Sequence, residues 1–96
     1  MSVRERIIKA LEEAFSPFFL QVDDFSEKHI GHSGYRDGGE SHFEVIVVSD
    51  LFVDKSLTER HRMIYHALDE EIRGGVHALK IKTLTVEEAK TRKMFI

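Results

Sequence analysis

Histidines are the residues of this 96-residue chain best suited to hold a metal, because it has six of them and no cysteine. His29 and His32 lie two residues apart in a glycine-rich stretch, and His77 follows a pair of glycines. Imidazole nitrogens are common metal ligands, and neighbouring glycines allow such ligands to reorient on binding. An H-x-x-H pair without cysteine is nevertheless a weak zinc signal, since structural zinc sites gather four ligands. Spacing alone therefore favours solvent-exposed loop histidines at 29 and 32, and a packed or capped residue at 77.

A second group with possible chemistry is Arg60-His61-Arg62. Three consecutive helical residues spread over about 200° of the helix, so these three cannot all face one ligand. Arg60 and Arg62 could contact phosphates or carboxylates of a partner, although a solvated helix face is the commoner explanation. The chain contains no nucleotide-binding glycine motif and no G-x-S-x-G nucleophile motif. No catalytic residue is therefore predicted.

Length and composition predict one small domain over residues 1–96, with 42% hydrophobic and 32% charged residues. A chain of this size buries only about 60–65% of its unfolded surface, which disfavours an elaborate enzyme active site. Its apolar runs fall far short of the roughly 20 residues that a membrane span requires, and the first residues lack a signal-peptide core. We expect a cytoplasmic protein that does not bind membranes.

Hydrophobic periodicity predicts the elements that must position these residues. The first fifteen residues form a helix that begins with the capping-box pair Ser2 and Glu5 and ends before Pro17. A short strand follows over residues 19–22, then an exposed, mobile glycine- and histidine-rich loop over residues 25–41. A strand over residues 42–48 pairs with the first strand in antiparallel fashion.

The second half repeats the pattern of helix, strand and helix. Ser56 and Glu59 open a second helix that runs to Gly74-Gly75, a third strand covers residues 76–84, and Thr85 with Glu88 opens a last helix over residues 86–93. The order α-β-β-α-β-α predicts an α+β fold with the helices packed on one face of a three-stranded sheet.

Nearly the whole chain resembles the BolA family. The resemblance runs from about residue 2 to residue 89, and its most specific part combines F-x-x-K-S-L-x-x-R-H-R with V-H-A-L. It rests on Ser41-His42-Phe43, Val47-Val48-Ser49, Phe52, Lys55-Ser56-Leu57, Glu59-Arg60-His61-Arg62, Tyr65 and Gly75-Val76-His77-Ala78-Leu79. A glycine that commonly follows the phenylalanine is replaced by Val53-Asp54, a minor departure. The implied fold is BolA-like and similar to class II KH domains.

The resemblance implies a protein partner rather than a substrate. BolA-like proteins form heterodimers with monothiol glutaredoxins around a bridging [2Fe–2S] cluster, to which the glutaredoxin and its glutathione supply thiolates. The family's C-terminal histidine ligand falls on His77, and the second ligand falls in the loop that holds His29 and His32, with the choice between them open. His42, which opens the following strand, is a poorer candidate.

Iron chemistry is consistent with this implication. A chain without cysteine cannot supply the usual four thiolates, but one or two imidazoles can complete a cluster that a partner carries. Imidazole ligation is expected to raise the cluster's potential and to weaken on acidification. We therefore expect no cofactor on the isolated chain, which we predict to be a monomer, and a role in cluster transfer or sensing. Contacts with glutaredoxin in the absence of iron are compatible with this role.

The rival hypothesis is a nucleic-acid-binding transcriptional regulator, because some BolA-like proteins are described in that way. Arg60, Arg62, Lys80 and Lys82 would then contact phosphates. The net charge of −3 and the absence of the KH-type G-x-x-G segment at the position between helices speak against it. The sequence thus favours the iron–sulfur partner over the regulator.

Overall fold

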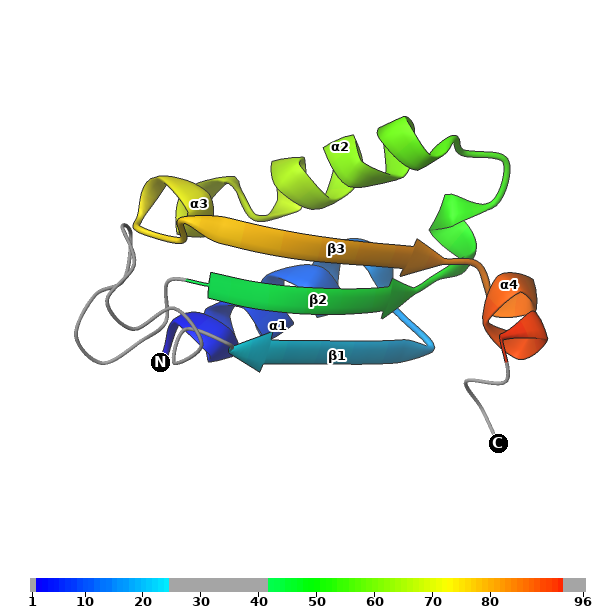
Figure 1. Ribbon diagram of the computed structural model, residues 1–96, viewed down its shortest axis with the longest axis horizontal. Helices are drawn as coiled ribbons and strands as arrows, with labels where there is room; N and C mark the ends of the chain where they lie inside the picture. The colour runs from blue at the N-terminus through cyan, green and yellow to red at the C-terminus, as the bar shows by residue number, and fades with distance from the viewer. Residues whose placement is uncertain (1, 25–41, 93–96) are drawn as a thin grey trace.

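A three-stranded sheet with helices packed against it forms the body of the chain in the computed structural model, which describes residues 2–24 and 42–92 (Figure 1). The α+β class and the predicted order are confirmed, while the predicted loop over residues 25–41 lies outside the described residues. The elements are α1 (Val3–Phe15), β1 (Phe19–Asp24), β2 (His42–Val48), the short 3-10 helix η2 (Asp50–Phe52), α2 (Leu57–Ala67), α3 (Asp69–Arg73), β3 (Ala78–Leu84) and α4 (Val86–Thr91).

Reciprocal capping boxes begin α1 and α4, as predicted. The hydroxyl of Ser2 accepts the N–H of Glu5 at 3.1 Å, and the Glu5 carboxylate accepts the N–H of Ser2 at the same distance. In α4, the Thr85 N–H donates to the Glu88 carboxylate at 2.8 Å, and the Thr85 hydroxyl accepts the Glu88 N–H at 3.1 Å. Each box satisfies donors that the first turn of a helix leaves without an intrahelical partner.

The single helix predicted from Ser56 to Gly74-Gly75 is wrong in one respect, because it is divided into α2 and α3 at Leu68. The backbone of Leu68 leaves helical geometry, with φ −104° and ψ 19°, while its side chain is buried in the core. Burial of one side chain here outweighs the local preference for a continuous helix. The chain still leaves α3 at the glycine pair, as predicted.

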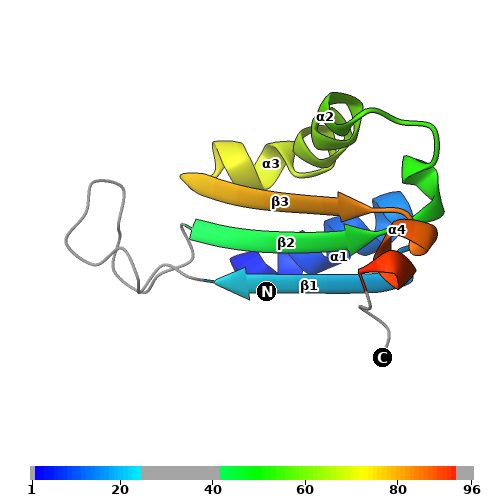
Figure 2. The same cartoon turned by 45° about the vertical axis from the view of Figure 1, so that its right-hand side comes forward.

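The sheet order is β1-β2-β3. β1 and β2 pair in antiparallel fashion with Val22 opposite Val45, which confirms the predicted pairing, whereas β2 and β3 are parallel, with His42 opposite Ala78. The helices α2 and α3 make the crossover that a parallel pair requires. The end of β1 and the starts of β2 and β3 consequently meet at one end of the sheet (Figures 1 and 2).

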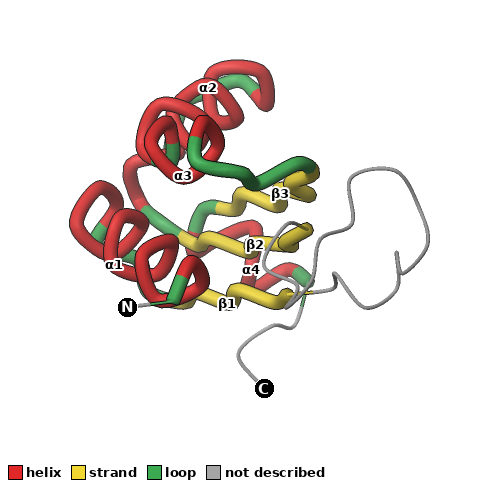
Figure 3. The backbone as a smooth tube through the Cα atoms, turned by 90° about the vertical axis from the view of Figure 1, so that its left-hand side faces the viewer, coloured by secondary structure: helices red, strands yellow, loops and turns green. Residues whose placement is uncertain are grey.

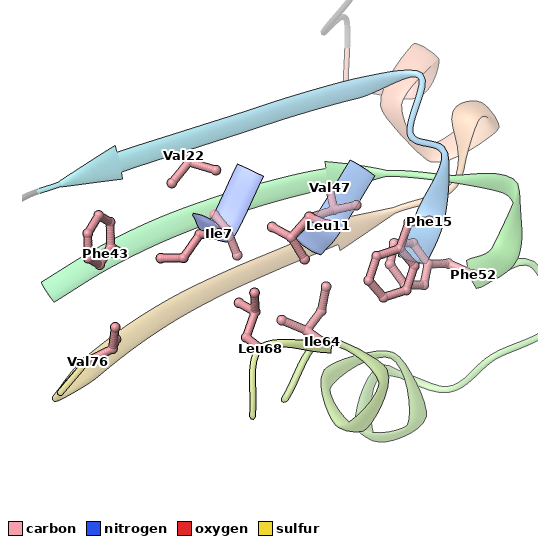
Figure 4. Packing of buried hydrophobic residues seen from close by; sticks show 11 residues of the cluster. Ile7, Leu11, Phe15, Val22, Phe43, Val47, Phe52, Ile64, Leu68 and Val76 are labelled. Carbon is pink, nitrogen blue, oxygen red and sulfur yellow. The ribbon is translucent and has the colours of Figure 1, made fainter. Parts of the chain in front are cut away.

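One face of the sheet carries the main hydrophobic core, and α1, α2 and α3 lie on that side (Figure 3). Leu11 from α1, Ile64 from α2 and Val47 from β2 are all fully buried there, and Figure 4 shows these side chains pointing toward one another. The short helix α4 instead packs Ala89 against a separate small cluster with Val48 and Leu84. None of the described helices is long and apolar enough to cross a membrane.

Candidate metal-binding site

His77 lies in the short connection between α3 and β3, and the residues before and after it are both fixed in the fold. Gly75 adopts a φ of 130°, a conformation that glycine alone takes readily, and this turns the chain from α3 toward the sheet. Val76 is buried in the core, and Ala78 opens β3. His77, between these two, has an exposed side chain. The result is an accessible imidazole on a firmly anchored backbone.

His42 is the other histidine at this end of the sheet. It opens β2 opposite Ala78 of β3, so it lies beside His77, and the two ring centroids are 6.4 Å apart with an interplanar angle of 39°. The two side chains differ in solvent exposure: His42 is only 6% exposed, whereas His77 is exposed. From the sequence alone, His42 is a poorer candidate than the loop histidines. The sequence sign of its position is the helical segment between the second and third strands, because a helical crossover joins parallel strands, whose starts lie at the same end of a sheet.

His29 and His32 lie outside the described residues, so the choice between them stays a prediction. The chain that carries them leaves β1 at Asp24 and returns at His42, and both points lie at the same end of the sheet as the start of β3. His29 is five residues beyond Asp24, and an extended segment of that length spans up to about 16 Å. Chain length therefore permits a histidine from this segment to meet His77.

The described part of the chain contains no group of three or more histidine, aspartate or glutamate side chains arranged to hold a metal ion. His42 and His77 are two imidazoles, fewer than the four ligands of a closed tetrahedral site. These two imidazoles alone cannot complete a metal site. Any metal bound at this end of the sheet would need further ligands from another molecule or from another part of the chain.

The four basic residues predicted for nucleic-acid contacts do not form one surface. Lys80 and Lys82 are exposed on β3 and alternate with Leu79 and Ile81, which pack toward the core on the helix side. Arg62 is exposed on α2, and Figure 3 shows that α2 lies on the side of the sheet that the helices cover. The lysines and Arg62 thus belong to different faces.

Acidic residues accompany the lysines on the uncovered face of the sheet. The register sets Glu44 of β2 beside Lys80, and Asp23 of β1 beside Glu44. These positions alternate with core positions in the same way, so the three side chains share a face. This face therefore carries mixed charge rather than a continuous basic stripe.

Arg60 is engaged in contacts within the fold. Its guanidinium donates to both carboxylate oxygens of Glu88, at 2.7 and 3.4 Å, and its Nε donates to the Lys55 carbonyl at 3.0 Å. It also lies over the ring of Phe52, with Cζ 5.9 Å from the ring centroid, and its side chain is 12% exposed. The hydrogen bonds from Arg60 and from the Thr85 N–H hold the pKa of the Glu88 carboxyl below its usual value. Arg60 thus links α2 to α4.

The topology defines a small α+β domain with an exposed histidine, His77, at one end of its sheet. Comparison with known proteins gives the family: the chain belongs to the BolA-like proteins, whose family model, "BolA-like protein", matches residues 11–88. It is 47% identical over 88 residues to the DNA-binding transcriptional regulator BolA of Escherichia coli, covering 92% of this chain and 80% of that protein. The E. coli relative is thus named as a regulator and not as an enzyme.

Plant relatives contain the same domain within a longer protein. SufE-like protein 1 of Arabidopsis thaliana is 45% identical over 87 residues, which are 86% of this chain and 24% of that protein. The chain thus spans about a quarter of this relative. The solved BolA domain of SufE1 from Arabidopsis thaliana superimposes with a TM-score of 0.82 at 43% identity, covering 92% of this chain and 96% of that one.

Proposed function

We propose that this chain is a non-enzymatic partner of a monothiol glutaredoxin and supplies imidazole to a [2Fe–2S] cluster that the two proteins share. The observation that carries the proposal is the exposed imidazole of His77, fixed between buried Val76 and β3 at the end of the sheet where residues 25–41 leave and return. His32 or His29 supplies the second ligand. Trafficking of the cluster, or regulation of iron and redox state, is the function that this arrangement serves.

The donor set of the chain fits a shared cluster. Iron–sulfur clusters are usually held by four thiolates, and this chain has no cysteine. Mixed sets in which histidines replace two cysteines on one iron are also known chemistry, as in Rieske centres. The glutaredoxin and its glutathione would supply the thiolates, while His77 and a histidine of the 25–41 segment supply nitrogen. When bound, the cluster provides one-electron chemistry and transferable iron and sulfide.

The two nitrogen ligands would differ in how they are held. His77 has a backbone anchored by Val76 and by pairing of β3 with β2. The second ligand comes from a segment that carries four glycines, at positions 31, 34, 38 and 39. With one ligand on an anchored backbone and one on a glycine-rich segment, the chain could bind the cluster and release it again. Such reversible binding suits cluster transfer or sensing.

Titration of the chain into anaerobic, [2Fe–2S]-loaded monothiol glutaredoxin, followed by visible circular dichroism, tests the proposal. We expect a new cluster spectrum that saturates at one chain per glutaredoxin. His77→Ala should alter or abolish it, and His29→Ala and His32→Ala should then identify the second ligand. His66→Ala is the matched control, because His66 is also exposed but lies on α2. A spectrum that remains that of the glutaredoxin alone at every ratio would contradict the proposal.

DNA binding is the second candidate function, favoured by the name of the E. coli relative at 47% identity and by exposed Lys80 and Lys82 on β3. Affinity for a DNA duplex should fall steeply as salt rises, because phosphate contacts release counterions. Lys80→Ala with Lys82→Ala should reduce both the affinity and the salt slope, by about one unit of slope for each lost contact. Absence of binding at about 50 mM salt, where such contacts are strong, would rule out this candidate.

A further inference from the structure

An open groove of about 660 Å³ lies at the end of the sheet where β2 and β3 finish, remote from His42 and His77. One wall comes from η2 and the turn that follows it, and the other comes from α4. Figure 1 shows α4 at the end of the sheet where the arrows of β2 and β3 finish. Asp50, Val53 and Asp54 line the first wall, and Val86, Glu87 and Thr91 line the second. The proposed iron–sulfur function uses none of these residues.

Carboxylates dominate the charge of this groove. Glu88 and Arg60 also line it, but their 2.7 Å ion pair neutralises both. The remaining charged side chains are the carboxylates of Asp50, Asp54 and Glu87, all exposed, against the single amine of Lys90. The groove therefore has a net negative charge and complements a basic occupant.

Apolar side chains also line the groove. Val53 in the first wall is 49% exposed, and Val86 of α4 in the second wall is half-buried. Apolar groups of a partner that cover Val53 would remove apolar surface from water, which favours binding. The 3-10 helix places Phe52 in the core and leaves its neighbours Leu51 and Val53 at the surface.

We propose that this groove docks an extended segment of a partner protein in which lysine or arginine alternates with apolar side chains. The basic groups would meet Asp50, Asp54 and Glu87, and the apolar groups would cover Val53. Because the groove and His77 lie at opposite ends of β3, both sites can be occupied at once. This inference does not depend on the iron–sulfur proposal.

Binding of a six-residue peptide that alternates leucine and lysine, followed by backbone NMR shifts of the full chain, tests the inference. We expect saturable shifts at Val53, Asp54 and Glu87, no shifts at His77, and weaker binding as salt screens the charges. A peptide with glutamate in place of lysine should not bind. Shifts centred elsewhere, or equal binding of both peptides, would overturn the inference.

Charge-neutralising variants identify the groups responsible. The triple variant Asp50→Asn, Asp54→Asn, Glu87→Gln should bind the lysine peptide about tenfold more weakly, since each exposed ion pair contributes about two- to threefold. Asparagine suits position 54 because the φ of Asp54 is 63°, a left-handed conformation that asparagine tolerates.

A matched control neutralises three exposed carboxylates elsewhere on the surface, at Glu12, Glu13 and Glu70. Equal losses in the control and groove triples would mean that general charge, not the groove, attracts the peptide, and would refute the proposal. Val53→Ser should also weaken binding, by removing apolar contact. Displacement of the peptide by self-association of the chain would identify a second copy as the occupant and likewise refute it.

Discussion

The imidazole rings of His42 and His77 lie side by side with centroids 6.4 Å apart, although one opens β2 and the other precedes β3. Parallel pairing of these strands is the cause, because it brings both strand starts to one end of the sheet. Their environments differ, since His42 is 6% exposed and His77 is exposed. We therefore expect His42 to contribute to stability and His77 to binding.

Urea unfolding of His42→Ala and His77→Ala separates these two contributions. His42→Ala should lower the free energy of unfolding by about 1–3 kcal/mol, because it removes a buried side chain next to the core. His77→Ala should change it by no more than about 0.5 kcal/mol, as is usual for exposed positions. Equal losses in the two variants would show that His77 is a structural residue, and any loss of cluster binding in His77→Ala would then need another explanation.

The Glu88 carboxylate gives the fold a pH dependence of known sign. Its pKa is lowered, first by the hydrogen bond from Arg60 and then by the Thr85 N–H, so folding favours the charged form. This contribution to stability is present above the pKa of the unfolded chain and is lost as the pH falls through the lower pKa of the folded chain. Because the Glu88 side chain is 44% exposed, solvent screening limits the contribution to less than about 1 kcal/mol.

Glu88→Gln tests this expectation and retains a side chain that can complete the capping box. Wild type should unfold at higher temperature than the variant at pH 7, and the difference should shrink as the pH falls below 4.5, the ordinary value from which the pKa of Glu88 is lowered. A difference that stays constant over this range would show that the charge of Glu88 is not the source of the stability.

Arg60 should matter more for stability than Arg62, two residues along the same helix. Arg60→Ala removes the contacts to Glu88, the Lys55 carbonyl and Phe52, and should cost about 1–3 kcal/mol of unfolding free energy. Arg62→Ala, at an exposed position, should cost no more than about 0.5 kcal/mol. Chemical denaturation of the two variants measures both values, and equal costs would contradict the role assigned to Arg60.

Gly75 should resist substitution because of its backbone conformation. A φ of 130° is strained for any residue with a Cβ, so Gly75→Ala should destabilise the chain by about 1–3 kcal/mol. Glu70→Ala, at an exposed position of α3, is the control and should be nearly neutral. If both variants unfold at the same urea concentration as wild type, the turn before His77 is not set by Gly75.

Local features of the fold could be predicted from the sequence because each depends on neighbouring residues. The capping boxes at Ser2 and Thr85 and the end of α3 at the glycine pair are of this kind. The break at Leu68 was not predictable from the helical pattern, because it depends on burial against the sheet. The continuation of β1 to Asp24 likewise depends on its pairing with Phe43 of β2.

The candidate site was predicted less completely, because it joins segments that are distant in the sequence. Spacing alone favoured a packed or capped residue at position 77, and only the family resemblance singled out His77 as a ligand; in the structure its side chain is exposed. The position of His42 beside it follows from strand pairing and not from spacing. For Arg60, the sequence could not reveal that Glu88, on a different helix, is its partner.

The most direct test of whether this chain ligates the cluster is a hyperfine measurement on the reduced [2Fe–2S] cluster. The chain is labelled with ¹⁵N-histidine, mixed with unlabelled cluster-loaded monothiol glutaredoxin, reduced, and examined by electron–nuclear double resonance. We predict ¹⁵N coupling from directly bound imidazole, lost or reduced in His77→Ala and retained in His66→Ala. A spectrum without ¹⁵N coupling, although the two proteins form a complex, would show that this chain does not ligate the cluster.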